Sequence, residues 1–241
     1  MIAQKTSIES TTASTHPLTT LPFTTLTFPE IHLDVRDAHK LRGYFGNLFK
    51  EHSPLLHNHF EDGRSRYAYP LVQYKVLRNV PTLVGMGEGA DLLAELFLKT
   101  QELNIEGTVY PLFTKEIKHS RVAIGMSEGP VRYRFETFWM ALNQENHRVY
   151  MESDESCDFI LLERILVGNI LSFFKAFGHF FGPDERVRVE LDIEAYRSAK
   201  FKDNKMAAFT GQFTTNVLLP DFIGLGKSVS RGFGTIHRIG A

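Results

Sequence analysis

The sequence predicts an α+β fold made of two α+β units in tandem with antiparallel sheets, the first of them a ferredoxin-like unit. Three observations lead to this prediction. Strands and helices are expected in the order β-α-β-β-α-β over residues 21–120, which is the order of a ferredoxin-like unit. A second series of strands with one long helix follows over residues 121–241. Several strands alternate apolar and polar residues, as antiparallel strands with one solvent-exposed face do.

The first unit is expected to follow a flexible leader, residues 1–20, which is rich in Ser and Thr and has no apolar periodicity. Residues 31–35 alternate and predict the first strand, and Asp37 can cap a helix over residues 38–48. Residues 69–77 predict the second strand, and a short third strand lies within residues 81–89. Apolar residues at helical spacing predict a helix over residues 90–100, and residues 107–117 predict the fourth strand.

The second unit is expected to begin with a strand over residues 131–139, a turn at residues 143–146 and a strand ending near Met151. Residues 158–181 form the longest apolar stretch and predict a buried helix. Charged residues within it, such as Glu163 and Arg164, argue against a membrane span. Residues 187–193 alternate cleanly, a partner strand runs through Val217, and residues 235–239 predict a last short strand.

The composition is that of a soluble globular protein, with 43% hydrophobic and 23% charged residues. The single cysteine, Cys157, excludes a disulfide framework and a cysteine-based zinc site. The N-terminal residues contain no signal-peptide core, so we expect a cytoplasmic protein that does not contact the membrane.

The charge is distributed unevenly along the chain. The net charge is −1, but residues 36–78 hold eight Lys/Arg against four Asp/Glu, and residues 197–241 hold seven against two. Residues 79–196 hold eleven against nineteen. Two basic segments that are far apart in sequence could therefore form one face for a polyanion. The alternative is solvated surface charge without a partner.

A glycine-rich loop at residues 222–235 is the most informative motif. Two Gly-x-Gly pairs flank five residues that include two cations and two serines, and Phe233 lies inside the second pair. Glycine permits close approach of another group, and exposed N–H groups of such a loop can bind an anion. The loop therefore predicts a phosphate site. It is not a nucleotide P-loop, because Asp221 stands where that motif needs glycine and too few residues follow for its helix. A plain glycine-rich hairpin, or a loop that binds a small phosphometabolite, are the alternatives.

The spacing Gly-x-Gly-x5-Gly-Phe-Gly near the C-terminus resembles the glycine-rich loop of the RAMP superfamily. The resemblance is best to its CRISPR-associated endoribonucleases, the sixth Cas family, which cut repeat RNA into guide RNAs. Residues 41–48 and 69–75 also look like the amino-terminal half of the subtype B branch. The resemblance spans most of residues 30–239 and implies tandem ferredoxin-like, RRM-like units that bind RNA.

Five of the ten histidines lie between residues 32 and 59, and His57 and His59 are the most suggestive pair. Three interpretations are open from the residues alone. The pair could bind a metal, although the only nearby carboxylates, Glu61 and Asp62, make a weak site. The histidines could be surface residues without chemistry. An imidazole could also act as general acid or base on RNA, because it titrates near neutral pH.

The resemblance favours the third interpretation. Many members of that family place a histidine after the first helix, a tyrosine on the helix and a basic residue beyond the histidine. At those places this sequence has His57 (or His59), Tyr44 and Arg64, where Arg replaces the usual Lys. We expect the RNA-binding residues to be Lys40, Arg42, Arg66, Gly224, Gly226, Lys227, Ser228, Arg231, Gly232, Phe233 and Gly234.

The sequence therefore predicts a metal-independent endoribonuclease that cleaves CRISPR repeat RNA by attack of a 2′-hydroxyl, with no cofactor. The alternative is a non-catalytic RAMP subunit that only holds RNA. Expected partners are the repeat RNA, other Cas subunits of an effector complex, and a second copy of the chain in a homodimer.

Overall fold

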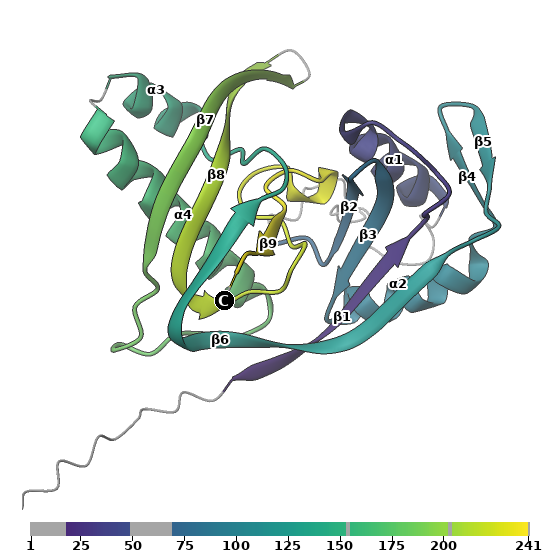
Figure 1. Cartoon of the computed structure of the whole chain (residues 1–241), viewed down its shortest axis with the longest axis horizontal. Coiled ribbons are helices and arrows are strands. Elements are labelled where there is room, and N and C mark those ends of the chain that lie inside the picture. The colour runs from purple at the N-terminus through teal and green to yellow at the C-terminus, as the bar shows by residue number, and fades with distance from the viewer. Residues whose placement is uncertain (1–17, 49–68, 153–154, 202–203, 241) are drawn as a thin grey trace, which may run out of the picture.

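The computed structural model describes residues 18–48, 69–152, 155–201 and 204–240 (Figure 1). The first half contains β1 (Thr19–Thr27), η1 (Val35–Asp37), α1 (Ala38–Leu48), β2 (Val72–Leu77), β3 (Val80–Met86), α2 (Glu88–Lys99), β4 (Glu102–Ile105) and β5 (Thr108–Pro111). The second half contains β6 (Glu116–Phe135), α3 (Gln144–Glu152), α4 (Glu155–Ala176), β7 (Val189–Phe201), β8 (Asn204–Leu218), η3 (Val229–Arg231) and β9 (Ile236–Arg238).

One antiparallel sheet runs through both units in the order β2-β3-β1-β6-β8-β7, and β9 pairs with β6. The long strand β6 joins the units, because its residues 116–124 pair with β1 and its residues 131–135 pair with β8 or β9. The order within the units is then β6-β1-β3-β2 and β9-β6-β8-β7, which is the ferredoxin-like arrangement twice. The predicted α+β class with antiparallel sheets is confirmed.

The expected boundary between residues 120 and 121 falls inside β6. β1 begins at Thr19, so the last two residues of the expected leader belong to a strand. In the second unit, the segment from Leu219 to Thr235 occupies the place of a second helix and contains only the short η3. The glycine-rich loop therefore takes the place of the second helix of this unit.

Two hydrophobic cores lie against this sheet. In the first unit, Leu41 and Phe45 of α1 and Leu93 of α2 pack with buried residues of β1, β2 and β3. The second core is built on α4, and Leu21 of β1 reaches it as well. The two units therefore share a core in addition to a strand.

Three predicted elements are wrong. Residues 31–35 are not a strand: Ile31 and Leu33 are buried, but the N–H of Ile31 donates to the carbonyl of Phe28 and that of Leu33 to Asn79, so no ladder forms. Residues 108–111 pair with β4 in a separate hairpin, and β6 supplies the fourth strand. The stretch ending near Met151 is helix α3.

Candidate nucleic-acid interface

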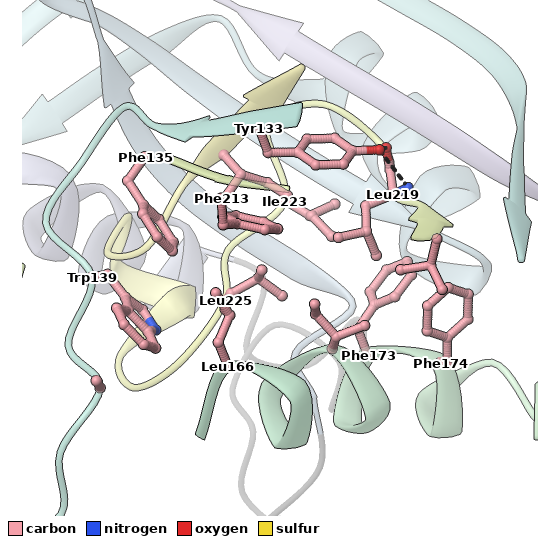
Figure 2. Close-up of a cluster of buried hydrophobic side chains, with 14 of the residues drawn as sticks. Tyr133, Phe135, Trp139, Leu166, Phe173, Phe174, Phe213, Leu219, Ile223 and Leu225 are labelled. Carbon is pink, nitrogen blue, oxygen red and sulfur yellow. Dashed lines mark hydrogen bonds between the residues drawn. The ribbon is translucent and has the colours of Figure 1, made fainter. Parts of the chain in front are cut away.

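The glycine-rich loop is anchored at its start by the core of the second unit. The Tyr133 hydroxyl donates to the carbonyl of Leu219 (3.1 Å) and lies 2.8 Å from its N–H, at the end of β8. Figure 2 shows that contact, with Ile223 and Leu225 directed into the cluster that contains Phe173 of α4. Ile223 and Leu225, on either side of Gly224, are therefore buried, and they fix the path of the loop.

The two Gly-x-Gly arms pair with each other. Gly224 forms an isolated antiparallel bridge with Thr235, and the N–H of Leu225 donates to the carbonyl of Gly234 (2.9 Å). Gly234 has φ +62, and a Cβ there would collide with the carbonyl oxygen of Leu225. Glycine is required at this position both for the left-handed backbone and for the close approach of the two arms.

The predicted anion nest is not formed by most of the glycine N–H groups. The N–H of Gly224 donates to Oε1 of Gln73 (2.9 Å), that of Gly232 to Val229 (3.2 Å), and that of Gly234 to Phe138 (2.8 Å). A donor engaged inside the protein is not available to a phosphate, so the expectation of a nest is wrong for these three. They can serve an RNA site only through the shape they give the loop.

The loop is held against the first unit by polar side chains of β2 and the residues just before it. The Tyr69 hydroxyl donates to the carbonyl of Gly224 (2.8 Å), and Gln73 receives the Gly224 N–H. Burial raises the pKa of Tyr69 above its ordinary range, so this hydroxyl keeps its proton. Lys75 donates from Nζ to Oγ1 of Thr235 (2.9 Å).

Cations from both basic segments meet at this junction. Arg42 lies on α1, Arg231 ends η3, and these two elements are in contact. Burial lowers the pKa of Arg42, and the positive charge of Arg231 lowers it further. Two positive charges on neighbouring elements raise the electrostatic potential there, which attracts anions.

Lys227 adds a third cation at the tip of the loop. Its side chain is exposed, and within the described ranges its ammonium has no hydrogen-bond or ion-pair partner. Partial burial lowers its pKa. Ser228 follows in a left-handed conformation (φ 56), which turns the chain into η3, and Phe233 is half-buried on the returning arm.

Lys40 and Tyr44 lie on α1 beside the β4–β5 hairpin, lining a groove of about 650 Å³ together with His39, Asn47 and Asn104. The Lys40 ammonium binds Asp37 (2.9 Å) and Glu106 (2.8 Å), so its charge is already balanced by two carboxylates. Those hydrogen bonds raise its pKa.

The Tyr44 hydroxyl donates to the carbonyl of Glu102 (2.8 Å), and burial raises its pKa. Both side chains therefore attach the hairpin to α1. Their predicted roles in catalysis and RNA binding remain predictions, and these contacts leave Lys40 little charge for a phosphate.

The remaining predicted site residues, His57, His59, Arg64 and Arg66, lie outside the described residues. Among the described residues, no three His, Cys, Asp or Glu side chains are grouped in a way that could hold a metal ion. None of the helices in the described residues is long and apolar enough to cross a membrane.

The sequence did not identify the residues of β2 that hold the loop. Gln73 and Lys75 are polar residues inside a strand that is otherwise apolar and buried on both faces. A lysine inside a buried apolar strand is unusual, and its presence could have indicated from the sequence that this strand has a polar partner.

Comparison with known proteins agrees with this architecture over nearly the whole chain. Residues 19–123 match the family model described as the Cas6b N-terminal domain, and residues 125–239 match the Cas6b C-terminal domain. A crystal structure of Cas6b is 32% identical and superposes with a TM-score of 0.85, covering 92% of this chain and all of that one. A crystal structure of the CRISPR RNA processing endoribonuclease Cas6b is 30% identical, with a TM-score of 0.74 and the same coverage.

Among curated proteins, the uncharacterized protein MJ0978 of Methanocaldococcus jannaschii is 36% identical over 147 residues, which is 61% of this chain and 99% of that protein. Matches to both domains and to two solved structures at 30% identity or more, over 92% of the chain, leave one assignment. The chain belongs to the Cas6b family.

Proposed function

We propose that this protein is an endoribonuclease that cleaves CRISPR repeat RNA to produce mature guide RNAs. The observation that carries the proposal is the contact of α1, which carries Arg42, with η3, which carries Arg231, because it brings the two basic segments together beside a loop whose tip exposes Lys227. Membership of the Cas6b family supports it, since one related structure is that of a CRISPR RNA processing endoribonuclease.

The reaction needs few protein groups, because the RNA supplies its own nucleophile. A base removes the proton of the 2′-hydroxyl, O2′ bonds to the adjacent phosphorus, and the bond from phosphorus to O5′ breaks. An acid then gives a proton to O5′. The products are a 2′,3′-cyclic phosphate, which can open to a 3′-phosphate, and a 5′-hydroxyl. His57 or His59 is proposed for the proton transfers, and the nearby arginines would stabilise the added charge on the phosphorane.

The proposed chemistry is metal-independent, and one experiment tests both the activity and this feature. Labelled repeat RNA is incubated with the protein in EDTA and separated on a denaturing gel. We expect one cut per repeat, with a cyclic or 3′-phosphate on the upstream product. Activity that disappears in EDTA and returns with a divalent ion would refute the mechanism and make the two histidines candidate ligands.

The companion substrate carries a 2′-deoxynucleotide at the mapped cut position. It lacks the proposed nucleophile, so we expect it to bind and remain intact. Cleavage of this substrate would mean that water is the attacking group. Tight binding of ordinary repeat RNA without any cleavage would instead identify a non-catalytic RAMP subunit.

A further inference from the structure

A buried lysine lies directly behind the glycine-rich loop. Lys75 belongs to β2 and has no exposed surface. Its Nζ donates to Oγ1 of Thr235 (2.9 Å), and within the described residues no carboxylate lies at ion-pair distance from it. A cation in this position is costly unless a negative charge compensates it.

The lysine is linked to the loop through a short chain of hydrogen bonds. The Thr235 hydroxyl, which accepts from Lys75, donates to the carbonyl of Gly232 (3.0 Å). The Thr137 hydroxyl donates to the same carbonyl (2.6 Å) and accepts from the N–H of Thr235 (2.9 Å). Gly232 directly follows Arg231, so the ammonium group is connected to the backbone that carries one of the site's arginines.

Lys75 can change its charge near neutral pH. Burial lowers its pKa from 10.5 to about 7. The elements packed against β2, and the residues beside Thr235, carry these charged or titratable groups: Arg36, Asp37, His39, Lys40, Arg42, Glu88, Asp91, Glu95, Lys99, Glu136, Arg231 and His237. β3 contributes none, and burial is the cause of the shift for Lys75. Among the described residues burial alone shifts the pKa of Lys75, so an anion that binds from solution can supply a counter-charge.

We propose that Lys75 is a positioning residue of the RNA site, which takes up a proton when a phosphate of the RNA binds at the glycine-rich loop. The inference rests on the proposed function, because it needs an RNA phosphate beside Arg42 and Arg231. An anion stabilises a buried cation strongly, since little water screens the interaction. The charged ammonium then holds Thr235, and through it the carbonyl of Gly232, in the RNA-bound position.

The test measures protons taken up on binding. Repeat RNA with the deoxy substitution is titrated into the protein between pH 7 and 8.5, by calorimetry in buffers of different ionisation enthalpy. Up to one proton taken up by Lys75 corresponds to an affinity that falls by up to about tenfold per pH unit over this range. We expect Lys75→Met, which keeps an unbranched side chain but removes the amine, to lose that proton uptake and the part of the pH dependence that comes from it.

The controls separate this role from a merely structural one. A structural defect would weaken binding equally at every pH, whereas loss of the proton changes the slope. Thr235→Val removes the hydroxyl with little change of shape and should also reduce the proton uptake on RNA binding. Thr235→Ser keeps a hydroxyl and should retain that uptake. The exposed Lys118→Met should keep the wild-type slope.

Two results would overturn the inference, and they can be distinguished. If the wild-type protein binds repeat RNA and Lys75→Met takes up the same number of protons, Lys75 has no such role while the proposed function stands. If the wild-type protein does not bind repeat RNA, the proposed function and this inference fail together.

Discussion

Replacing Lys75 by Met should stabilise the free protein, by an amount that depends on pH. In the unfolded chain the lysine has its ordinary pKa of 10.5, and in the folded protein burial lowers it to about 7. Between these values the unfolded state binds more protons than the folded state, so the wild-type free energy of unfolding rises with pH. The loss of stability caused by burying Lys75 has its full value below pH 7 and disappears as pH approaches 10.5.

The magnitude follows from the two pKa values. At 1.36 kcal/mol for each decade, the penalty is on the order of 5 kcal/mol below pH 6 and about 2 kcal/mol at pH 9. Methionine carries no charge at either pH, but it loses the hydrogen bond to Thr235, which offsets the gain by about 1 kcal/mol at both. The advantage of Lys75→Met should therefore shrink by roughly 3 kcal/mol from pH 6 to pH 9.

Urea unfolding of the RNA-free protein at pH 6, 7.5 and 9 measures this difference. Lys99→Met, at an exposed position near the end of α2, is the matched control and should show a small effect that is the same at each pH. A Lys75→Met variant whose stability differs from wild type by a constant amount at all three pH values would refute the reasoning. It would mean that Lys75 finds a compensating charge in the free protein.

Three further predictions concern the loop and the reaction. Gly234→Ala should destabilise the protein by roughly 1–3 kcal/mol more than Gly107→Ala, measured by urea unfolding, because both positions have positive φ but only the first Cβ meets the backbone of another arm. The double variant Lys227→Gln, Arg231→Gln should weaken RNA binding. The slope of the logarithm of the association constant against the logarithm of the salt concentration should become less steep by up to about 1.4, measured by titration at several salt concentrations. His57→Ala should slow cleavage by roughly 10²–10⁴-fold without a comparable loss of binding, measured by single-turnover kinetics.

Each of these has an outcome that contradicts it. Equal destabilisation of the two glycine variants would mean that the loop relaxes around the added methyl group. Arg148→Gln, on α3, should leave the salt slope unchanged, and an equal change there would reduce the loop double variant to a general charge effect. If His57→Ala and His59→Ala both cut at the wild-type rate, the active site lies elsewhere, and His39 is the next residue to replace.

Helix periodicity gave α1, α2 and α4 correctly, because each has an apolar stripe wide enough to be recognised. It failed at α3, which has no buried residue and begins where Asn143 looks like a turn. The Asn143 side chain in fact accepts the N–H of Asn146 (2.6 Å) and caps the helix. The first strand was missed because β1 is rich in threonine, and its Thr24 is buried by neighbours that the local sequence does not contain.

The sequence located the loop of the candidate site, but it did not predict the contacts that hold this loop in place. The spacing of the glycines located the loop, but the partners that occupy their N–H groups come from Gln73 and Phe138, far away in the sequence. The Lys75–Thr235 hydrogen bond joins residues 160 positions apart. Pairings of this kind are decided by how the two units meet, and a single sequence carries no direct sign of them.

The shared strand β6 limits how this protein can respond to RNA. Its β1-paired and β8-paired segments follow one another directly, and opening the units there would separate Leu21 from the core around α4 and break the hydrogen bonds that join Tyr69 and Gln73 to Gly224. Binding energy would then be spent on opening the protein. We expect instead that the surface where the two units meet keeps its conformation on binding, and that the RNA bends to fit it. Repeats should then be selected by how easily their backbone adopts the required path as well as by their bases, and stiff RNA of matching sequence should bind poorly.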